Sequence, residues 1–130
     1  KTTLVHGDFS PKNIMITEDF HPIVLDFEVE HTGNPVFDVA FLTAHLVCKF
    51  VKSENQDIAE TAHNFIVSYK EHSTIPLANS VAHHIGLLAL ARVEGVSPVN
   101  YLSSVEQEKL KVLTKKMLRN EGAQIRDFFN

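Results

Sequence analysis

The feature that most constrains this chain is a polar segment near its beginning that is enclosed by short apolar runs. Residues 6–13 read HGDFSPKN and lie between the runs 4–5 and 14–16, and a third run, 23–25, leads directly into Asp26. Short runs that are rich in Val and Ile and bounded by turn residues are typical of β-strands. The sequence therefore predicts a polar loop between two strands and a carboxylate at the end of a third.

The second and third runs are expected to form a hairpin. Residues 17–22, which connect them, have the composition of a turn. A hairpin would bring Asn13, just before the second run, to the same end of the molecule as Asp26. Asp8 lies on the same loop as Asn13, so all three polar side chains are expected near one another.

These three side chains suit phosphoryl transfer. The reaction asks a protein for a group that orients the acceptor hydroxyl and for metal ions that neutralise charge on the phosphates. Asp8 could accept the hydroxyl proton. The carboxamide oxygen of Asn13 and the carboxylate of Asp26 are hard oxygen ligands of the kind that Mg²⁺ prefers. The pattern predicts half of a phosphotransferase active site.

Four helices are expected after the strands. Asn34 is a suitable N-cap and Pro35 a favoured first helical residue. The helix that follows, about 36–50, is apolar on nearly every side, which is typical of a helix at the centre of a helical core. Further helices are predicted at about 57–71 with Asn55 as its cap, at about 77–94 with Gly95 as its end, and from the capping-box pattern of Ser104 and Gln107 onwards.

The predicted fold class is therefore mainly α (α+β), with a small β-hairpin patch followed by about four helices. Residues 1–130 are expected to form a single domain. Within it, the candidate catalytic and metal-binding loops occupy 4–30 and a helical subdomain occupies 34–130.

Composition argues against several other classes of protein. With 44% hydrophobic and 22% charged residues, the chain is globular rather than disordered. Its net charge of −4 gives no reason to expect nucleic-acid binding, and no run reaches the roughly 18 apolar residues of a membrane span. The single cysteine, Cys48, gives no disulfide framework, and no signal-peptide pattern is present. We therefore expect a cytoplasmic protein without a nucleic-acid or membrane partner.

The motifs resemble those of one enzyme superfamily. His6-Gly7-Asp8 with Asn13, followed by Leu25-Asp26-Phe27-Glu28, is similar to the catalytic and metal-binding loops of the aminoglycoside phosphotransferase and choline kinase superfamily. These enzymes are small-molecule relatives of the protein kinases, whose catalytic loop has a similar spacing. Residues 33–40 resemble the segment that follows the metal-binding loop in this superfamily, and 92–99 resemble a stretch near the end of its bacterial members.

The resemblance implies roles for the site residues. Asp8 would be the catalytic base, and Asn13 and Asp26 would hold Mg²⁺. The substrates would be ATP and a small molecule with a hydroxyl group, and the fold would be the C-terminal lobe of a protein-kinase-like enzyme.

The chain departs from the superfamily pattern in one respect. No G-x-G-x-x-G phosphate loop occurs in the sequence, and the strand lysine of the N-terminal nucleotide-binding lobe is also absent. We therefore expect residues 1–130 alone to have little or no kinase activity. We also expect them to self-associate through the surface that an N-terminal lobe would cover, because large exposed apolar patches tend to find partners.

Other polar residues near the motifs have weaker claims to a role. His6 is expected to hold the catalytic loop by packing and hydrogen bonding, and Asp38 to support it from the beginning of a helix. Lys12 could contact phosphate or substrate, or be an exposed loop lysine. Glu28 and Glu30 could line a pocket for a cationic acceptor, or be solvated. The remaining histidines show no zinc-binding spacing and are interpreted as surface or helix-packing residues: His45, His63, His72, His83 and His84.

Two alternatives stay open from the sequence. The first is a metal-dependent hydrolase that uses His6, Asp8 and Asp26 around a metal ion. The second is a non-catalytic helical interaction module or pseudo-kinase remnant, whose folding and partner binding would not depend on Asp8 or Asp26.

Overall fold

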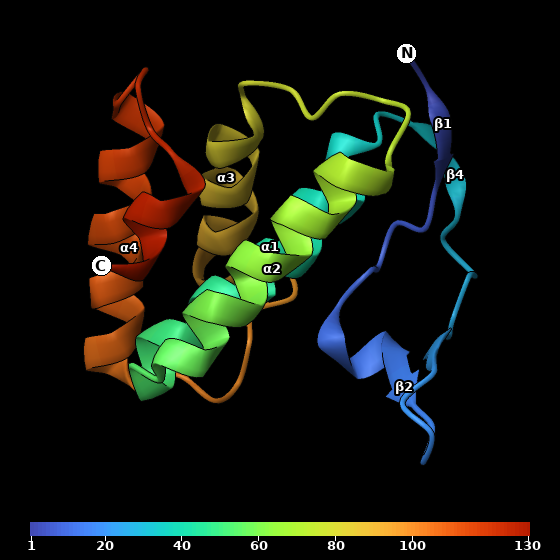
Figure 1. Cartoon of the computed structure of the whole chain (residues 1–130). Coiled ribbons are helices and arrows are strands. Elements are labelled where there is room, and N and C mark those ends of the chain that lie inside the picture. Colours follow the sequence, from blue (N-terminus) through green and yellow to red (C-terminus); the bar gives the residue numbers. More distant parts are fainter.

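The computed structural model describes residues 1–130. The strands lie on one side of the molecule and the helices on the other (Figure 1). Four short strands form two antiparallel pairs. β1 (Thr3–Val5) pairs with β4 (His31–Gly33), and β2 (Ile14–Ile16) pairs with β3 (Pro22–Val24). The predicted hairpin of the second and third runs is confirmed, with β3 beginning and ending one residue earlier than expected.

The pairing of β1 with β4 determines where the polar loops lie. Leu4 is opposite Thr32 and Val5 is opposite His31, so residues 6–30 form one long excursion between these two strands. The β2–β3 hairpin projects from that excursion, at the lower right of Figure 1. The strand β4 was not predicted from the sequence.

Four α-helices and two short 3-10 helices make up the rest of the structure. The mainly α (α+β) class with a small strand patch and four helices is confirmed. The helices are α1 (Val36–Ser53), α2 (Gln56–His72), α3 (Val81–Glu94) and α4 (Ser104–Arg119), with the 3-10 helices η1 (Pro11–Asn13) and η2 (Ile125–Phe129).

Helix α1 lies at the centre of the helical part, as its apolar sequence predicts. It packs against α2, α3 and α4, and Ala40, Val47 and Cys48 on it are fully buried. Burial raises the pKa of the Cys48 thiol to about 12, so this cysteine is an unreactive core residue at neutral pH. Asn34 caps the helix by accepting a hydrogen bond from the backbone N–H of Val36 at 3.0 Å.

Two predicted helix beginnings were placed wrongly. Helix α3 begins at Val81 rather than near Leu77, after the turn at 79–80. Helix α4 is capped one residue earlier than predicted, because Ser103 and Glu106 form the reciprocal capping box. The predicted N-cap Asn55 and the predicted end at Gly95 are both confirmed.

None of the four helices is both long enough and apolar enough to cross a membrane. Apolar side chains are nevertheless exposed along the strand region. Those at least 40% exposed there are Leu4, Met15, Ile16, Phe20, Ile23, Leu25, Phe27 and Val29.

Self-association of residues 1–130 stays a prediction. We expect the weight-average mass from light scattering to rise with protein concentration, because the exposed apolar side chains of the strand region favour burial against another surface. Replacing Phe20 and Phe27 with Ser should reduce this rise. A monomer mass that does not change with concentration would contradict the expectation.

Candidate active site

The loop that carries Asp8 leaves the end of β1 and closes into η1 directly before β2. Its backbone is set by Gly7, which has φ +86°, and by Pro11, which begins the 3-10 helix. Positive φ suits glycine because glycine has no Cβ. Ser10 in the middle of the loop is fully buried. The loop is therefore anchored in the fold, and Asp8 has a defined position on it.

Asp8 is held by its near neighbours on this loop. The Asn13 amide nitrogen Nδ2 donates to the Asp8 backbone oxygen at 2.8 Å and to the Asp8 carboxylate oxygen Oδ2 at 3.0 Å. The Lys12 ammonium lies 3.4 Å from the same carboxylate oxygen, although Lys12 is itself 71% exposed. The Asp8 side chain remains 28% exposed, so it is oriented and still reachable from solvent.

The Asp26 loop is joined to the Asp8 loop through the hairpin. The backbone N–H of Leu25 donates to the carbonyl of Asn13 at 2.8 Å, which extends the β2–β3 pairing by one step. Asp26 follows with φ +61°, in the left-handed region that is uncommon for residues other than glycine. The structure thus brings Asn13 and Asp26 to the same end of the hairpin.

The oxygen donors of Asn13 and Asp26 fit a Mg²⁺ ion. Both hydrogen bonds of the Asn13 side chain use its nitrogen, so its oxygen Oδ1 is free, and the Asp26 carboxylate is exposed and forms no ion pair. The nitrogen and oxygen of Asn13 are assigned from these hydrogen bonds. Mg²⁺ commonly uses one or two carboxylates and completes its coordination with water and phosphate oxygens. No group of three His, Cys, Asp or Glu side chains forms a metal cage in the chain.

His6 connects the two loops and is buried. Its Nδ1 accepts a hydrogen bond from the Asp8 backbone N–H at 3.1 Å, so the proton on the neutral ring resides on Nε2, which donates to the Leu25 carbonyl at 2.8 Å. Both ring nitrogens are therefore occupied by the backbone. A hydrolase mechanism with His6 as a metal ligand would require one of these hydrogen bonds to break.

Asp38, in the first turn of α1, supports the same loop. Its carboxylate oxygens accept the backbone N–H of His6 at 2.8 Å and of Gly7 at 3.0 Å. Hydrogen bonds to a charged acceptor are stronger than neutral ones. The central helix α1 and the loop that carries Asp8 are therefore joined directly at the residues that precede Asp8.

Replacing Gly7 with Ala should destabilise the protein. An alanine Cβ would lie 2.6 Å from the Val29 carbonyl oxygen, and the backbone strain alone costs about 1–3 kcal/mol of unfolding free energy. Gly122→Ala is the matched control, because its nearest atom would be the Asn120 side-chain oxygen at 3.5 Å. Chemical denaturation of both variants checks the difference, and equal unfolding free energies for the two would contradict this description of the loop.

The remaining candidate residues are spread over different surfaces. Lys12 lies against Asp8, as described above. Glu30 lines an apolar cavity of about 410 Å³ between the strand region and α2, together with His6 and Phe27. Glu28 is exposed on the loop between β3 and β4. The structure does not bring Glu28 or Glu30 to the cavity that Asp8 lines.

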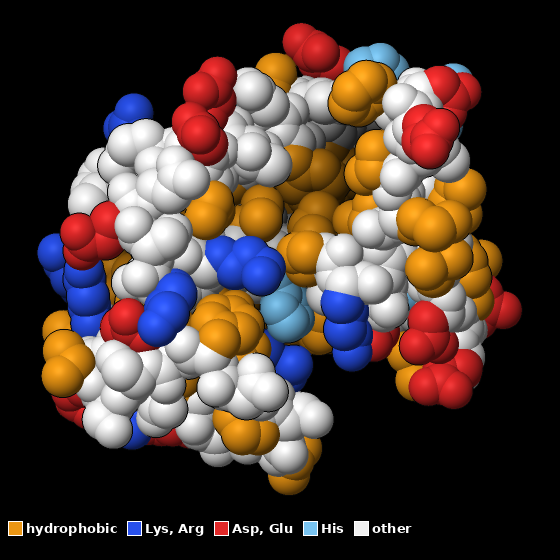
Figure 2. All heavy atoms as spheres, turned by 90° about the horizontal axis from the view of Figure 1, so that it is seen from below, with side chains coloured by type: hydrophobic (Ala, Val, Ile, Leu, Met, Phe, Trp, Pro, Cys, Tyr) orange, Lys and Arg blue, Asp and Glu red, His pale blue; other side chains and the backbone are white.

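Asp8 lines a second cavity, of about 670 Å³, between its own loop, α1, α3 and the connector that follows α3. Figure 2 shows Lys and Arg side chains gathered around a His on one face, next to a hollow lined by hydrophobic side chains. The side chains of this second cavity that carry nitrogen are Lys12, His45, Lys49, Arg92 and Asn100.

Three basic residues of the cavity were not predicted from the sequence to have a functional role. His45 and Lys49 come from α1 and Arg92 from α3. Burial lowers the pKa of His45 to about 4, and the charges of Arg92 and Lys49 act in the same direction, so the ring is neutral at pH 7. The sequence contains a signal for two of these residues, which is their spacing. His45 and Lys49 are four residues apart in an otherwise apolar helix, which puts them on one face.

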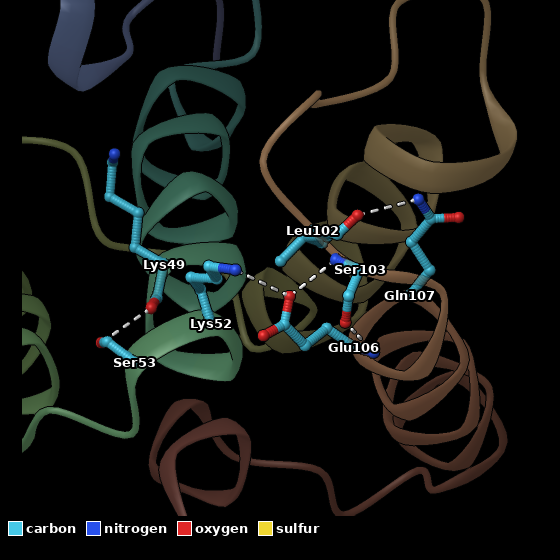
Figure 3. A network of polar contacts seen from close by, with 7 residues as sticks. All are labelled: Lys49, Lys52, Ser53, Leu102, Ser103, Glu106 and Gln107. Carbon is cyan, nitrogen blue, oxygen red and sulfur yellow. Dashed lines mark hydrogen bonds and ion pairs between the residues drawn. The ribbon is translucent and has the colours of Figure 1, made fainter.

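The connector that forms one wall of the cavity, residues 97–101, leads into the hydrogen-bonded beginning of α4 (Figure 3). Glu106 accepts the backbone N–H of Ser103 at 2.7 Å, and the same oxygen pairs with Lys52 of α1 at 3.3 Å. The hydrogen bond to Ser103 lowers the pKa of Glu106, and Lys52 adds to this. In Figure 3 the Lys49 ammonium points away from this pair, so Lys49 is not neutralised by it.

Comparison with known proteins identifies the family of the chain. Residues 1–72, which contain both loops, Asp38 and the first two helices, match the phosphotransferase enzyme family. No curated protein and no solved structure matches the chain. The family match covers more than half of the 130 residues, so the chain belongs to the phosphotransferase enzyme family.

Proposed function

We propose that this chain carries the acceptor-binding and metal-binding half of an ATP-dependent kinase that phosphorylates a hydroxyl group of a small molecule. The observation that carries the proposal is the position of Asp8, whose carboxylate is oriented by Asn13 and which lines a cavity of about 670 Å³. A cavity of this volume is within the range of small-molecule sites. In this reading the chain corresponds to the C-terminal lobe of a kinase-like enzyme that works in the cytoplasm, where ATP is available.

The proposed reaction transfers the γ-phosphate of ATP to the acceptor hydroxyl, with Asp8 as the proton acceptor. The acceptor hydroxyl donates a hydrogen bond to Asp8, and its oxygen attacks the γ-phosphorus of ATP. The new O–P bond forms as the bond to the β,γ-bridging oxygen breaks, ADP leaves, and the hydroxyl proton passes to the Asp8 carboxylate. Asn13 keeps Asp8 pointed at the acceptor through the contact with Oδ2.

Mg²⁺ would be held by the free Asn13 oxygen and the Asp26 carboxylate. When bound, it would neutralise negative charge on the phosphates of ATP. The left-handed backbone at Asp26 is consistent with such a role, because strained residues gather at functional sites.

The proposal is tested by measuring ATP consumption by the protein of the complete gene, with Mg²⁺, against a panel of hydroxyl acceptors. The panel should include sugars, amino alcohols, aminoglycosides, hydroxy acids and sugar phosphates. We expect acceptor-dependent formation of ADP with at least one class. No turnover with any acceptor, together with no binding of ATP, would refute the kinase function.

A further inference from the structure

The cavity beside Asp8 carries more positive than negative charge. Its lining contains the cations Lys12, Lys49 and Arg92, whereas Asp8 is the only carboxylate in it. Lys12 already pairs with Asp8 at 3.4 Å. The remaining two cations, from α1 and α3, therefore have no negative charge opposite them in the cavity.

Lys49 and Arg92 also lack carboxylate partners elsewhere. Neither forms an ion pair, although four of the other lysines outside the cavity pair with glutamates: Lys52, Lys109, Lys111 and Lys115. Instead, the Lys49 ammonium lies 5.1 Å from the centre of the Tyr101 ring, and the Arg92 guanidinium lies 5.3 Å from the centre of the Phe41 ring. Aromatic faces hold both cations without neutralising them.

The buried polar atoms without a hydrogen bond also collect at this cavity. Four side-chain atoms of the chain are buried and unpartnered: Ser10 Oγ, His45 Nε2, Arg92 Nε and Tyr101 Oη. All four residues line the cavity of Asp8. Most buried polar atoms in proteins have a partner, and leaving one without is costly. Unpartnered groups from four different segments around one cavity indicate a polar ligand that supplies the missing contacts.

We propose that the acceptor of this kinase is anionic, a small hydroxyl compound that bears a carboxylate or phosphate group bound by Arg92 and Lys49. The inference rests on the proposed function, since it names the substrate class of the same site. Repulsion from the Asp8 carboxylate keeps the anionic group at the Arg92 side of the cavity and leaves the hydroxyl group to face Asp8.

This assignment differs from the cationic acceptor that Glu28 and Glu30 suggested in the sequence analysis. Both glutamates are exposed, and neither lines the cavity that contains Asp8. A cationic acceptor would meet Arg92, Lys49 and Lys12 there, and like charges at close range are unfavourable.

Calorimetric titration of residues 1–130, without ATP or metal, tests the inference. The probes are glycerol 3-phosphate, glycerate, glycerol and choline at equal ionic strength, which vary the charge of a small hydroxyl compound. We expect binding of one or both anions and none of glycerol or choline. The anion that binds more tightly identifies the acceptor's charged group as phosphate or carboxylate. Binding should also raise the pKa of His45, measured by NMR, because a nearby anion favours the protonated ring.

The variants Arg92→Gln and Lys49→Gln should each weaken anion binding about tenfold or more, the usual effect of losing a charged hydrogen bond. Lys116→Gln, which removes the same charge from an exposed site of α4 outside the cavity, should leave it unchanged. Thermal unfolding checks that each variant folds. If Arg92→Gln unfolds, Lys49→Gln alone decides the outcome.

Four results would overturn the inference. The first two are binding of choline in preference to both anions and equal loss of affinity in Lys116→Gln. The other two are absence of binding by either anion and displacement of the bound anion by ATP, which would assign the cations to the nucleotide. Failure of the proposed kinase function would give a different experimental result from failure of the anion site. Anion binding that depends on Arg92 and Lys49, with neither turnover nor ATP binding by the protein of the complete gene, would refute the kinase and leave the anion site intact.

Discussion

Asp8→Asn is expected to lower kcat by about 10²–10⁴-fold, the usual contribution of a positioned general base. Asparagine has the shape of aspartate, and its side-chain oxygen can still accept the hydrogen bond that Asn13 donates at 3.0 Å. The exposed ion pair with Lys12 contributes little to stability. The substitution therefore removes the proton acceptor while it preserves the loop, and the affinity for ATP should change little.

The measurement is steady-state phosphorylation of the best acceptor by the complete protein, with ATP affinity determined separately. Asp57→Asn is the matched control, since Asp57 is an exposed carboxylate in the first turn of α2 and should have no effect on turnover. A kcat for Asp8→Asn within twofold of that of the unaltered protein would remove Asp8 from the catalytic step. It would also favour the alternative of a non-catalytic module.

Asp38→Ala is expected to reduce the unfolding free energy by about 2–3 kcal/mol, because it removes two hydrogen bonds to a charged acceptor. The backbone N–H groups of His6 and Gly7 would lose their partners at 2.8 and 3.0 Å. The loop that carries Asp8 would then be less fixed relative to α1. Hydrogen exchange at the amides of these two residues should accelerate more than exchange in the centre of α3.

Asp57→Ala provides the control for this substitution. Both aspartates lie in the first turn of a helix and interact favourably with its dipole, which is worth about 0.3–1 kcal/mol. The side chain of Asp57 forms no hydrogen bond, so the difference between the two variants isolates the contacts with the loop. Equal destabilisation of the two proteins in urea would show that Asp38 acts only through the helix dipole.

The local part of the site could be predicted from the sequence. Asp8 and Asn13 are five residues apart on one loop, and the hairpin of β2 and β3 brings Asp26 to the same end through the Asn13–Leu25 contact. These relations depend on turns and short-range pairing, which leave clear composition signals. The central position of α1 was also predictable, because its sequence is apolar on nearly every side.

Contacts between distant segments were harder to predict. The strand β4 contains only His31, Thr32 and Gly33, which carry no strand signal, and it forms because β1 is available to pair with it. The beginning of α4 was ambiguous by one residue, because Ser103 with Glu106 and Ser104 with Gln107 both have capping-box spacing. The geometry of the cap decides between them, and the sequence alone does not.

The charge of the cavity could not be deduced from the motifs. Lys12, Lys49 and Arg92 come from a loop and two different helices, and only the packing of α1 against α3 places them around one space. If the acceptor is anionic as proposed, the motif residues indicate the reaction class, and side chains with no motif of their own select the acceptor. This division is common, because one fold supports many substrates by changing the surroundings of a shared site.

The proposed function requires that the site of Asp8, Asn13 and Asp26 transfers phosphate from ATP to a hydroxyl group. Phosphorus NMR of a reaction of the complete protein with ATP, Mg²⁺ and an acceptor tests it most directly. We expect a phosphomonoester of the acceptor that forms in a one-to-one ratio with ADP and does not form with Asp8→Asn. Release of inorganic phosphate in place of the phosphomonoester, at the same rate with and without acceptor, would contradict it.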